Sequence, residues 1–208
     1  VATMLDNTYH TPLQMNPGSF GVDVVAHSCT KYMGGHADVM AGALVFSTAR
    51  MQRYVRHEGN LFASAASPFA AWLVGRGLRT LKVRLDQHER VGNRVAGWLE
   101  GRPEVERVHH ISLDSSSQRE LFRRQCRGSG GLFSFEPKVQ DRDRVFAFCD
   151  ALKLFGRGIS WGGYESLVVA AHVNPLGERG RWVVRLFCGL EEPSDLIRDL
   201  EAALPLLA

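Results

Sequence analysis

The sequence lacks the paired cysteines and histidines by which many proteins bind zinc. Its four cysteines are far apart and form no Cys-x-x-Cys pair: Cys29, Cys126, Cys149 and Cys188. The eight histidines include no His-Glu-x-x-His pattern. We therefore expect no metal site, and we expect reduced thiols in a cytoplasmic protein.

Long hydrophobic runs, a basic leader, internal repeats and low-complexity tracts are also missing. A transmembrane helix needs about 20 apolar residues, and no stretch approaches that length. The net charge is +3 with scattered positive residues, which predicts neither a nucleic-acid stripe nor a membrane patch. At 208 residues and 45% hydrophobic content, the chain can form one large or two small globular domains.

The most informative stretch follows a short apolar run at residues 24–26, which reads as the end of a strand. The next residues form a loop with Ser28 and Thr30 before Lys31 and two glycines after it. A lysine amine in such a loop can form a Schiff base with an aldehyde cofactor while hydroxyl groups bind a phosphate. On residues alone, a solvated loop lysine is the alternative.

Residues 23–36 resemble the lysine signature of the trans-sulfuration (Cys/Met metabolism) enzymes, which use pyridoxal 5'-phosphate (PLP). The signature has an acidic residue, an apolar residue, three residues of any kind and two small residues, then Thr-Lys-aromatic-apolar-x-Gly-His. Ala37, just beyond it, departs slightly, because Ser, Gly or Asn is usual there. The resemblance implies that Lys31 is catalytic and binds the cofactor, and that Ser28 and Thr30 bind its phosphate.

A second candidate lies at Asp6, directly after an apolar segment at residues 1–5 that reads as a buried strand. Ligands bind at the carboxyl ends of strands in α/β sheets, although an Asx-turn or a helix cap also explains this residue. Asp-Asn-Thr-aromatic resembles the second motif of the same family. The resemblance implies that Asp6 and Thr8 bind the cofactor and that Asp6 is catalytic. Its carboxylate would keep the pyridine nitrogen protonated, which makes the ring a better electron sink.

Two further motifs lie in the second half of the chain. Arg185 interrupts an apolar stretch, either on an edge strand that reaches water or as a two-pronged clamp for a carboxylate. Arg-apolar-x-x-Gly-Leu-Glu and Ser-Trp-Gly-Gly-Tyr-Glu-Ser-Leu both resemble family motifs. The resemblance implies that Arg185, Ser160 and Trp161 bind the substrate, although Ser160 by itself reads as a turn residue. Trp161 favours the bacterial cystathionine β-lyases, since relatives that work at the γ-carbon commonly have Leu there.

The predicted fold class is α/β. Residues 1–90 would be the C-terminal part of a fold type I PLP-dependent transferase-like large domain, including the start of a connector helix. Residues 91–208 would be a smaller C-terminal α+β domain with an antiparallel sheet. We expect a second buried strand at 41–46, a polar loop at 56–64, and a helix that starts at Ser67-Pro68, bends at 75–77 and ends near residue 100.

The resemblance implies a PLP-dependent lyase that cleaves L-cystathionine by β-elimination to homocysteine, pyruvate and ammonia, in methionine biosynthesis. It also implies a cytoplasmic homo-oligomer, a dimer of dimers. It covers about the C-terminal half of such an enzyme, so we expect a fragment that binds PLP weakly alone. Cystathionine γ-synthase, γ-lyase and cysteine desulfhydrase activities stay open, as does a non-catalytic partner subunit.

Overall fold

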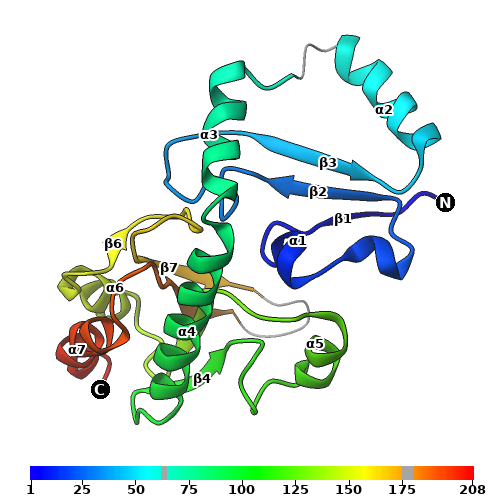
Figure 1. Ribbon diagram of the computed structural model, residues 1–208. Coiled ribbons are helices and arrows are strands. Elements are labelled where there is room, and N and C mark those ends of the chain that lie inside the picture. Colours follow the sequence, from blue (N-terminus) through cyan, green and yellow to red (C-terminus); the bar gives the residue numbers. More distant parts are fainter. Residues whose placement is uncertain (62–64, 175–179) are drawn as a thin grey trace.

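The computed structural model describes residues 1–61, 65–174 and 180–208. Two β-sheets lie at different ends of the molecule, and a pair of consecutive helices, α3 and α4, runs between them (Figure 1). Within the described part of the chain, no helix combines the length and the apolar character needed to cross a membrane.

The first sheet has the strand order β1 (Met4–Asp6), β2 (Val24–Ser28), β3 (Gly42–Phe46). Strand β1 is parallel to β2, whereas β3 is antiparallel to it. The carboxyl ends of the two parallel strands therefore meet at one edge, where Asp6 pairs with Ala26. The loop that carries Lys31 begins at this same edge.

The expectation that the flanking strands are buried is wrong. In β1, Met4 is 64% exposed, and in β3 Leu44 and Val45 are 45% and 55% exposed. Only the central strand β2 has buried apolar residues, Val24 and Val25. The apolar composition correctly indicates strands that favour burial, but the described residues of this chain do not supply a layer that covers them.

Between the strands of the first sheet lie α1 (Thr11–Gln14) and the 3₁₀ turn η1 (Pro17–Phe20), and α2 (Ala49–Leu61) follows β3. The predicted polar loop at 56–64 is wrong for residues 56–61, which continue α2, while 62–64 lie outside the described residues. Polar composition alone does not separate a loop from a helix at the surface, and Arg56 and His57 on α2 are exposed.

Helix α3 (Pro68–Leu78) begins as predicted, with Pro68 in its first turn and Ser67 Oγ accepting a hydrogen bond from Ala70 N at 3.1 Å. The break before α4 (Leu81–Glu100) falls at residues 79–80 and not at the predicted bend. The two glycines at 75 and 77 stay helical. Gly77 is needed for close approach, because a Cβ there would lie 2.3 Å from the carbonyl oxygen of Gly34.

The second sheet has the order β4-β5-β8-β7-β6. Its strands are β4 (Val105–His109), β5 (Leu132–Pro137), β6 (Gly156–Arg157), β7 (Leu167–Val173) and β8 (Arg181–Phe187). The predicted antiparallel pairing holds for the first four strands but is wrong for the short edge strand β6, which runs parallel to β7. Helix α5 (Arg119–Gln125) connects β4 to β5, and α6 (Arg142–Ala151), α7 (Pro193–Ala203) and the turn η2 (Leu204–Leu207) complete the chain.

The main core lies between the second sheet and helices α4, α6 and α7. Fully buried side chains from all of these elements fill it, among them Val95, Phe135, Phe148, Leu186 and Leu200. Each such side chain contributes about 1.5–3 kcal/mol by leaving water. The second half of the chain is therefore a packed platform for the groups at its edge.

A smaller core cluster joins the two sheets. It contains Tyr32 from the lysine loop, Leu81 and Leu85 from the first two turns of α4, and Phe187 from β8. Helix α4 thus belongs to both cores, with its start on the lysine loop and its later turns on the second sheet. The division at residues 90 and 91 stays a prediction, and it falls in the middle of this shared helix.

Candidate active site

Polar groups gather at the edge of the first sheet where β1 and β2 end. Asp6 Oδ1 accepts hydrogen bonds from both the backbone N–H and the hydroxyl of Thr8, the former at 2.8 Å. The same hydroxyl oxygen accepts a hydrogen bond from the backbone N–H of Ser28 at 2.7 Å. Asp6 is therefore in an Asx-turn, and Thr8 couples this turn to the end of β2. The carboxylate itself stays exposed.

Lys31 lies in the tight turn that follows β2. Its N–H donates to Ser28 O at 3.1 Å, and its carbonyl oxygen accepts from Gly35 N at 2.8 Å. Its ammonium Nζ donates to Ser160 Oγ at 3.0 Å and lies 5.5 Å from the centre of the Trp161 ring. The structure thus brings together a lysine and two substrate-site candidates that are about 130 residues away in the sequence.

Partial burial lowers the pKa of Lys31, and the positive charge of Arg185 lowers it further. A lysine amine reacts as a nucleophile or base only when it is neutral, so both effects favour the reactive form. Arg185, on β8, also donates through Nη2 to the carbonyl oxygen of Ile159 at 2.6 Å. Because Ile159 directly precedes Ser160, Arg185 also orders the strand-to-turn segment that Lys31 contacts.

The two hydroxyl residues that precede Lys31 are placed differently. Thr30 Oγ1 accepts from Ala41 N at 3.1 Å and donates a long bond of 3.4 Å to Ala41 O, so this hydroxyl closes the base of the lysine loop. Ser28 is half-buried, and its hydroxyl has no hydrogen-bond partner in the described part of the chain. Ser28 is therefore the hydroxyl that is available for a ligand.

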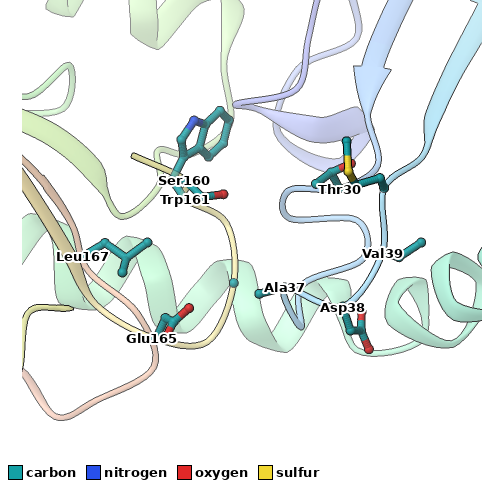
Figure 2. Close-up of a pocket in the computed structure, with 10 residues that line it drawn as sticks. Thr30, Ala37, Asp38, Val39, Ser160, Trp161, Glu165 and Leu167 are labelled. Atoms are coloured by element: carbon teal, nitrogen blue, oxygen red, sulfur yellow. The ribbon is translucent and has the colours of Figure 1, made fainter. Parts of the chain in front are cut away.

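A cavity of about 340 Å³ lies between the lysine loop and the segment that carries Ser160 (Figure 2). In Figure 2, Thr30 and Val39 lie on one side and Ser160 and Glu165 on the other, with the Ser160 hydroxyl directed across the gap. Ser160 lines the cavity and also accepts the hydrogen bond from Lys31. The amine is therefore next to a space that can hold part of a small ligand.

Sequence reasoning missed the role of aromatic residues that hold this arrangement. Tyr32 is fully buried, accepts a hydrogen bond from Gly131 N at 2.9 Å, and packs its ring 5.5 Å from that of Trp161. Tyr9 packs 6.2 Å from the same indole, and burial raises its pKa to about 12, so its phenol stays neutral. Both tyrosines occupy the aromatic positions of the two family motifs, which is the signal that was available in the sequence.

Gly162 was also missed, although it directly follows Trp161. Its φ is +87°, a conformation that favours glycine. A Cβ on it would lie 2.9 Å from Lys31 Cα. The absence of a side chain therefore allows the second half of the chain to pack directly on the backbone of the lysine.

The side chains at this site fit PLP, a molecule that carries an aldehyde, a phosphate and a pyridine nitrogen. Lys31 offers an amine with a lowered pKa, Ser28 an uncommitted hydroxyl, and Asp6 an exposed carboxylate at the same sheet edge. These are the three kinds of group that such a molecule requires. We find no cluster of three or more metal-ligating side chains among the described residues.

Comparison with protein families gives one match over most of the chain. The model of the Cys/Met metabolism PLP-dependent enzymes matches residues 1–205. Among curated relatives, the chain is 39% identical over 208 residues to cystathionine beta-lyase MetC of Escherichia coli, with 96% of this chain and 52% of the relative covered. It is 36% identical over 211 residues to a cystathionine gamma-lyase of Dictyostelium discoideum, with 97% and 54% covered.

A solved structure agrees with the sequence matches. Cystathionine gamma synthase from Xanthomonas oryzae pv. oryzae, in complex with aminoacrylate and cysteine, superposes with a TM-score of 0.92 at 35% identity. The match covers 100% of this chain and 56% of that one. The chain spans about half the length of the curated relatives it matches.

Proposed function

Because the chain belongs to the Cys/Met metabolism PLP-dependent enzyme family, we propose that it carries the reactive lysine of a PLP-dependent carbon–sulfur lyase. The observation that carries this proposal is the position of Lys31 Nζ, 3.0 Å from Ser160 Oγ and near the charge of Arg185. The lowered pKa favours the neutral amine that amino-acid chemistry on PLP requires, and Ser160 and Arg185 are its neighbours.

In this proposal the side chains at the first sheet hold the cofactor. PLP, when bound, supplies an electron sink for the pair released at the substrate α-carbon. Lys31 binds its aldehyde, and Asp6 places a negative charge for the pyridine nitrogen. Ser28 donates to the phosphate, and Thr30 joins it by exchanging its long bond to Ala41 O. Thr8 holds Asp6 and the end of β2 in register.

The second half of the chain binds the substrate in this proposal. The guanidinium of Arg185 and the hydroxyl of Ser160 orient the α-carboxylate, since planar guanidinium groups match carboxylates with two parallel hydrogen bonds. The neutral amine of Lys31 then accepts the proton from the substrate α-carbon at Nζ. Trp161 covers the amine from the side, which limits access of water and of large substrates.

We propose L-cystathionine as the substrate and β-elimination as the reaction, with homocysteine, pyruvate and ammonia as products. The support is Trp161, which bacterial cystathionine β-lyases share. Incubation of the full-length gene product with PLP and L-cystathionine tests this directly. Pyruvate supports β-cleavage, whereas 2-oxobutyrate as the main keto acid would assign the protein to γ-chemistry, the second candidate that the γ-lyase and γ-synthase relatives favour.

The proposal includes a homo-oligomer in the cytoplasm that serves methionine biosynthesis. Support for an oligomer comes from an apolar pair on α3, Phe69 and Trp72, which stack at 6.0 Å while 68% and 61% exposed. Such pairs are typical of contact surfaces. A chain that serves only as a non-catalytic partner would show no absorbance from a lysine–PLP adduct, and that scan separates the two readings.

A further inference from the structure

One buried charge in the molecule has no role in the site described so far. Arg84, in the first turn of α4, is 6% exposed. None of the ion pairs among the described residues involves it. A guanidinium without a carboxylate partner is expensive to bury unless other acceptors satisfy it. The groups that accept hydrogen bonds from Arg84 therefore indicate which part of the structure it holds in place.

All three acceptors of Arg84 lie at the junction of the lysine loop with α3 and α4. Its Nη1 donates to Tyr32 O at 2.7 Å, its Nη2 to Gly77 O at 2.8 Å, and its Nε to Thr80 Oγ1 at 3.0 Å. Tyr32 is the residue directly after Lys31. One guanidinium thus fixes the backbone beside the reactive lysine to the end of one helix and the start of the next.

The lysine loop is shaped to receive this guanidinium. Gly35 has a φ of +73°, and a Cβ on it would lie 2.0 Å from Arg84 Nη1. On the other side of the loop, a Cβ on Gly77 would meet Gly34 O at 2.3 Å. The absence of a side chain at Gly35 leaves space for Arg84, and its absence at Gly77 allows the lysine loop to contact α3 closely. The stability of α4 alone does not explain this fit.

We propose that Arg84 is a positioning residue for Lys31, which holds the lysine loop so that Nζ reaches Ser160. The proposal rests on the proposed function, because it takes Lys31 as the reacting amine. Gly162 fixes the opposite side of the lysine backbone. Without Arg84 the loop keeps its contacts at Thr30, Gly162 and the Tyr32 phenol. The backbone directly after Lys31 loses its tie to α3 and α4, and the amine can move away from Arg185 and into water.

The test uses the full chain in the variants Arg84→Met and Arg84→Lys. Arg84→Met removes the charge and all three hydrogen bonds at similar length, and Arg84→Lys keeps the charge but loses the planar fork. Two controls are on the same helix. Arg94→Met changes an exposed arginine, and Val95→Ala destabilises the main core without touching the lysine loop.

The first measurement is hydrogen exchange, resolved on the segment 29–35. Gly34 N and Gly35 N donate within this loop at 2.7 and 2.8 Å. We expect exchange there to accelerate about tenfold in Arg84→Met, and less in Arg84→Lys, because charge-assisted hydrogen bonds that hold the loop are lost. In Val95→Ala, exchange should rise across the second sheet. The segment 29–35 should remain as well protected, relative to the other segments, as it is in the wild type.

The second measurement is the pH profile of Lys31 labelling by trace acetic anhydride in the protein freed of PLP, read by mass spectrometry. In Arg84→Met the apparent pKa of Lys31 should rise toward the ordinary lysine value, with a smaller rise in Arg84→Lys and none in the controls. If both Arg84 variants match Val95→Ala in loop exchange and in labelling, the positioning role is wrong. Should Arg84→Met fail to fold, Arg84→Lys decides alone.

The two proposals can fail separately. A wild-type Lys31 that labels like an exposed lysine would contradict its proposed part in the reaction, while exchange in the segment 29–35 still decides the role of Arg84. Conversely, the pKa of Lys31 could be low in the wild type and unchanged in the Arg84 variants. That result would support Lys31 as the reacting amine and would contradict the positioning role of Arg84.

Discussion

The two sheets of this protein have similar apolar strands but different surroundings. In the second sheet, Val184 and Leu186 on β8 are fully buried beneath helices of the same chain. In the first sheet, Leu44 and Val45 on β3 remain about half exposed. The second sheet therefore has its own core, and the first has the candidate groups Asp6 and Lys31 at its edge. We propose that the second sheet supplies most of the stability, while the proposed reacting amine lies on the side of the first sheet.

The sharpest test of this division is Lys31→Ala. If the chemistry lies on the side of the first sheet, loss of the amine should reduce turnover by at least about 10³-fold, because both a covalent anchor and a proton acceptor disappear. The melting temperature should change little, since Lys31 is only partly buried. Steady-state rates and thermal unfolding of the full-length protein measure both, and substantial residual lyase activity would contradict the double role.

A pair of core substitutions tests the other side of the comparison. Leu186→Ala, at a fully buried position, should lower the free energy of unfolding by about 2–5 kcal/mol. Val45→Ala, at a position that is 55% exposed, should change it by less than about 0.5 kcal/mol. Urea unfolding monitored by circular dichroism provides the values. A large effect of Val45→Ala would mean that the first sheet is covered in solution.

Acid should destabilise the fold through two buried histidines, His88 on α4 and His110 after β4. Burial lowers the pKa of His88 and of His110 from 6.5 to about 4. The unfolded chain therefore binds protons at higher pH than the folded one, so stability is complete above pH 6.5 and falls as the pH drops toward 4. Each histidine accounts for up to about 3 kcal/mol at the acid end.

Unfolding free energies measured at several pH values check this sign. Replacing His110 by Gln should flatten the acid slope, although the loss of its hydrogen bonds to Ser112 lowers stability throughout. His57→Gln, on the exposed surface of α2, is the matched control. An acid slope unchanged by His110→Gln would remove this histidine from the explanation.

The smallest expected effect is that of a substitution at Arg185, which tests what the second sheet contributes to the site beside Lys31. Arg185→Ala should raise KM for the amino-acid substrate by about 10- to 100-fold with a smaller change in kcat, since it removes a hydrogen-bonded charge for the carboxylate. Arg181→Ala, on the same strand but facing Glu136, is a control outside the site. An unchanged KM in Arg185→Ala would mean that this arginine only orders the Ile159 segment.

Sequence reasoning reached the family and the α/β class, because the motifs around Lys31, Asp6 and Arg185 are long and specific. The same motifs assigned Lys31 and Ser160 to one active site, and the structure adds the hydrogen bond between them. Local patterns did not reveal the exposure of β3, since an apolar strand looks the same whether its cover lies in the chain or elsewhere. They also could not reveal the parallel pairing of β6, which has only two residues.

The residues that hold the backbone next to Lys31, namely Arg84, Gly35 and Gly162, were the hardest to predict. Arg84 lies in a helix whose pattern of polar and apolar residues assigns it no special place, and its partners are backbone carbonyl groups that any sequence supplies. Gly162 and Gly35 lie within the family motifs, but the motifs assign them no role of their own. Their role depends on how close two backbones approach, which is a property of tertiary structure rather than of spacing.

The close approach of Gly162 to Lys31 has a consequence for any effort to alter what this protein acts on. Even one added methyl group at position 162 would lie 2.9 Å from Lys31 Cα and force the lysine backbone to shift, whereas the indole at 161 faces Nζ, which lies 5.5 Å from the ring centre. For the proposed lyase, libraries directed at new thioethers should therefore vary residue 161 and leave residue 162 unchanged.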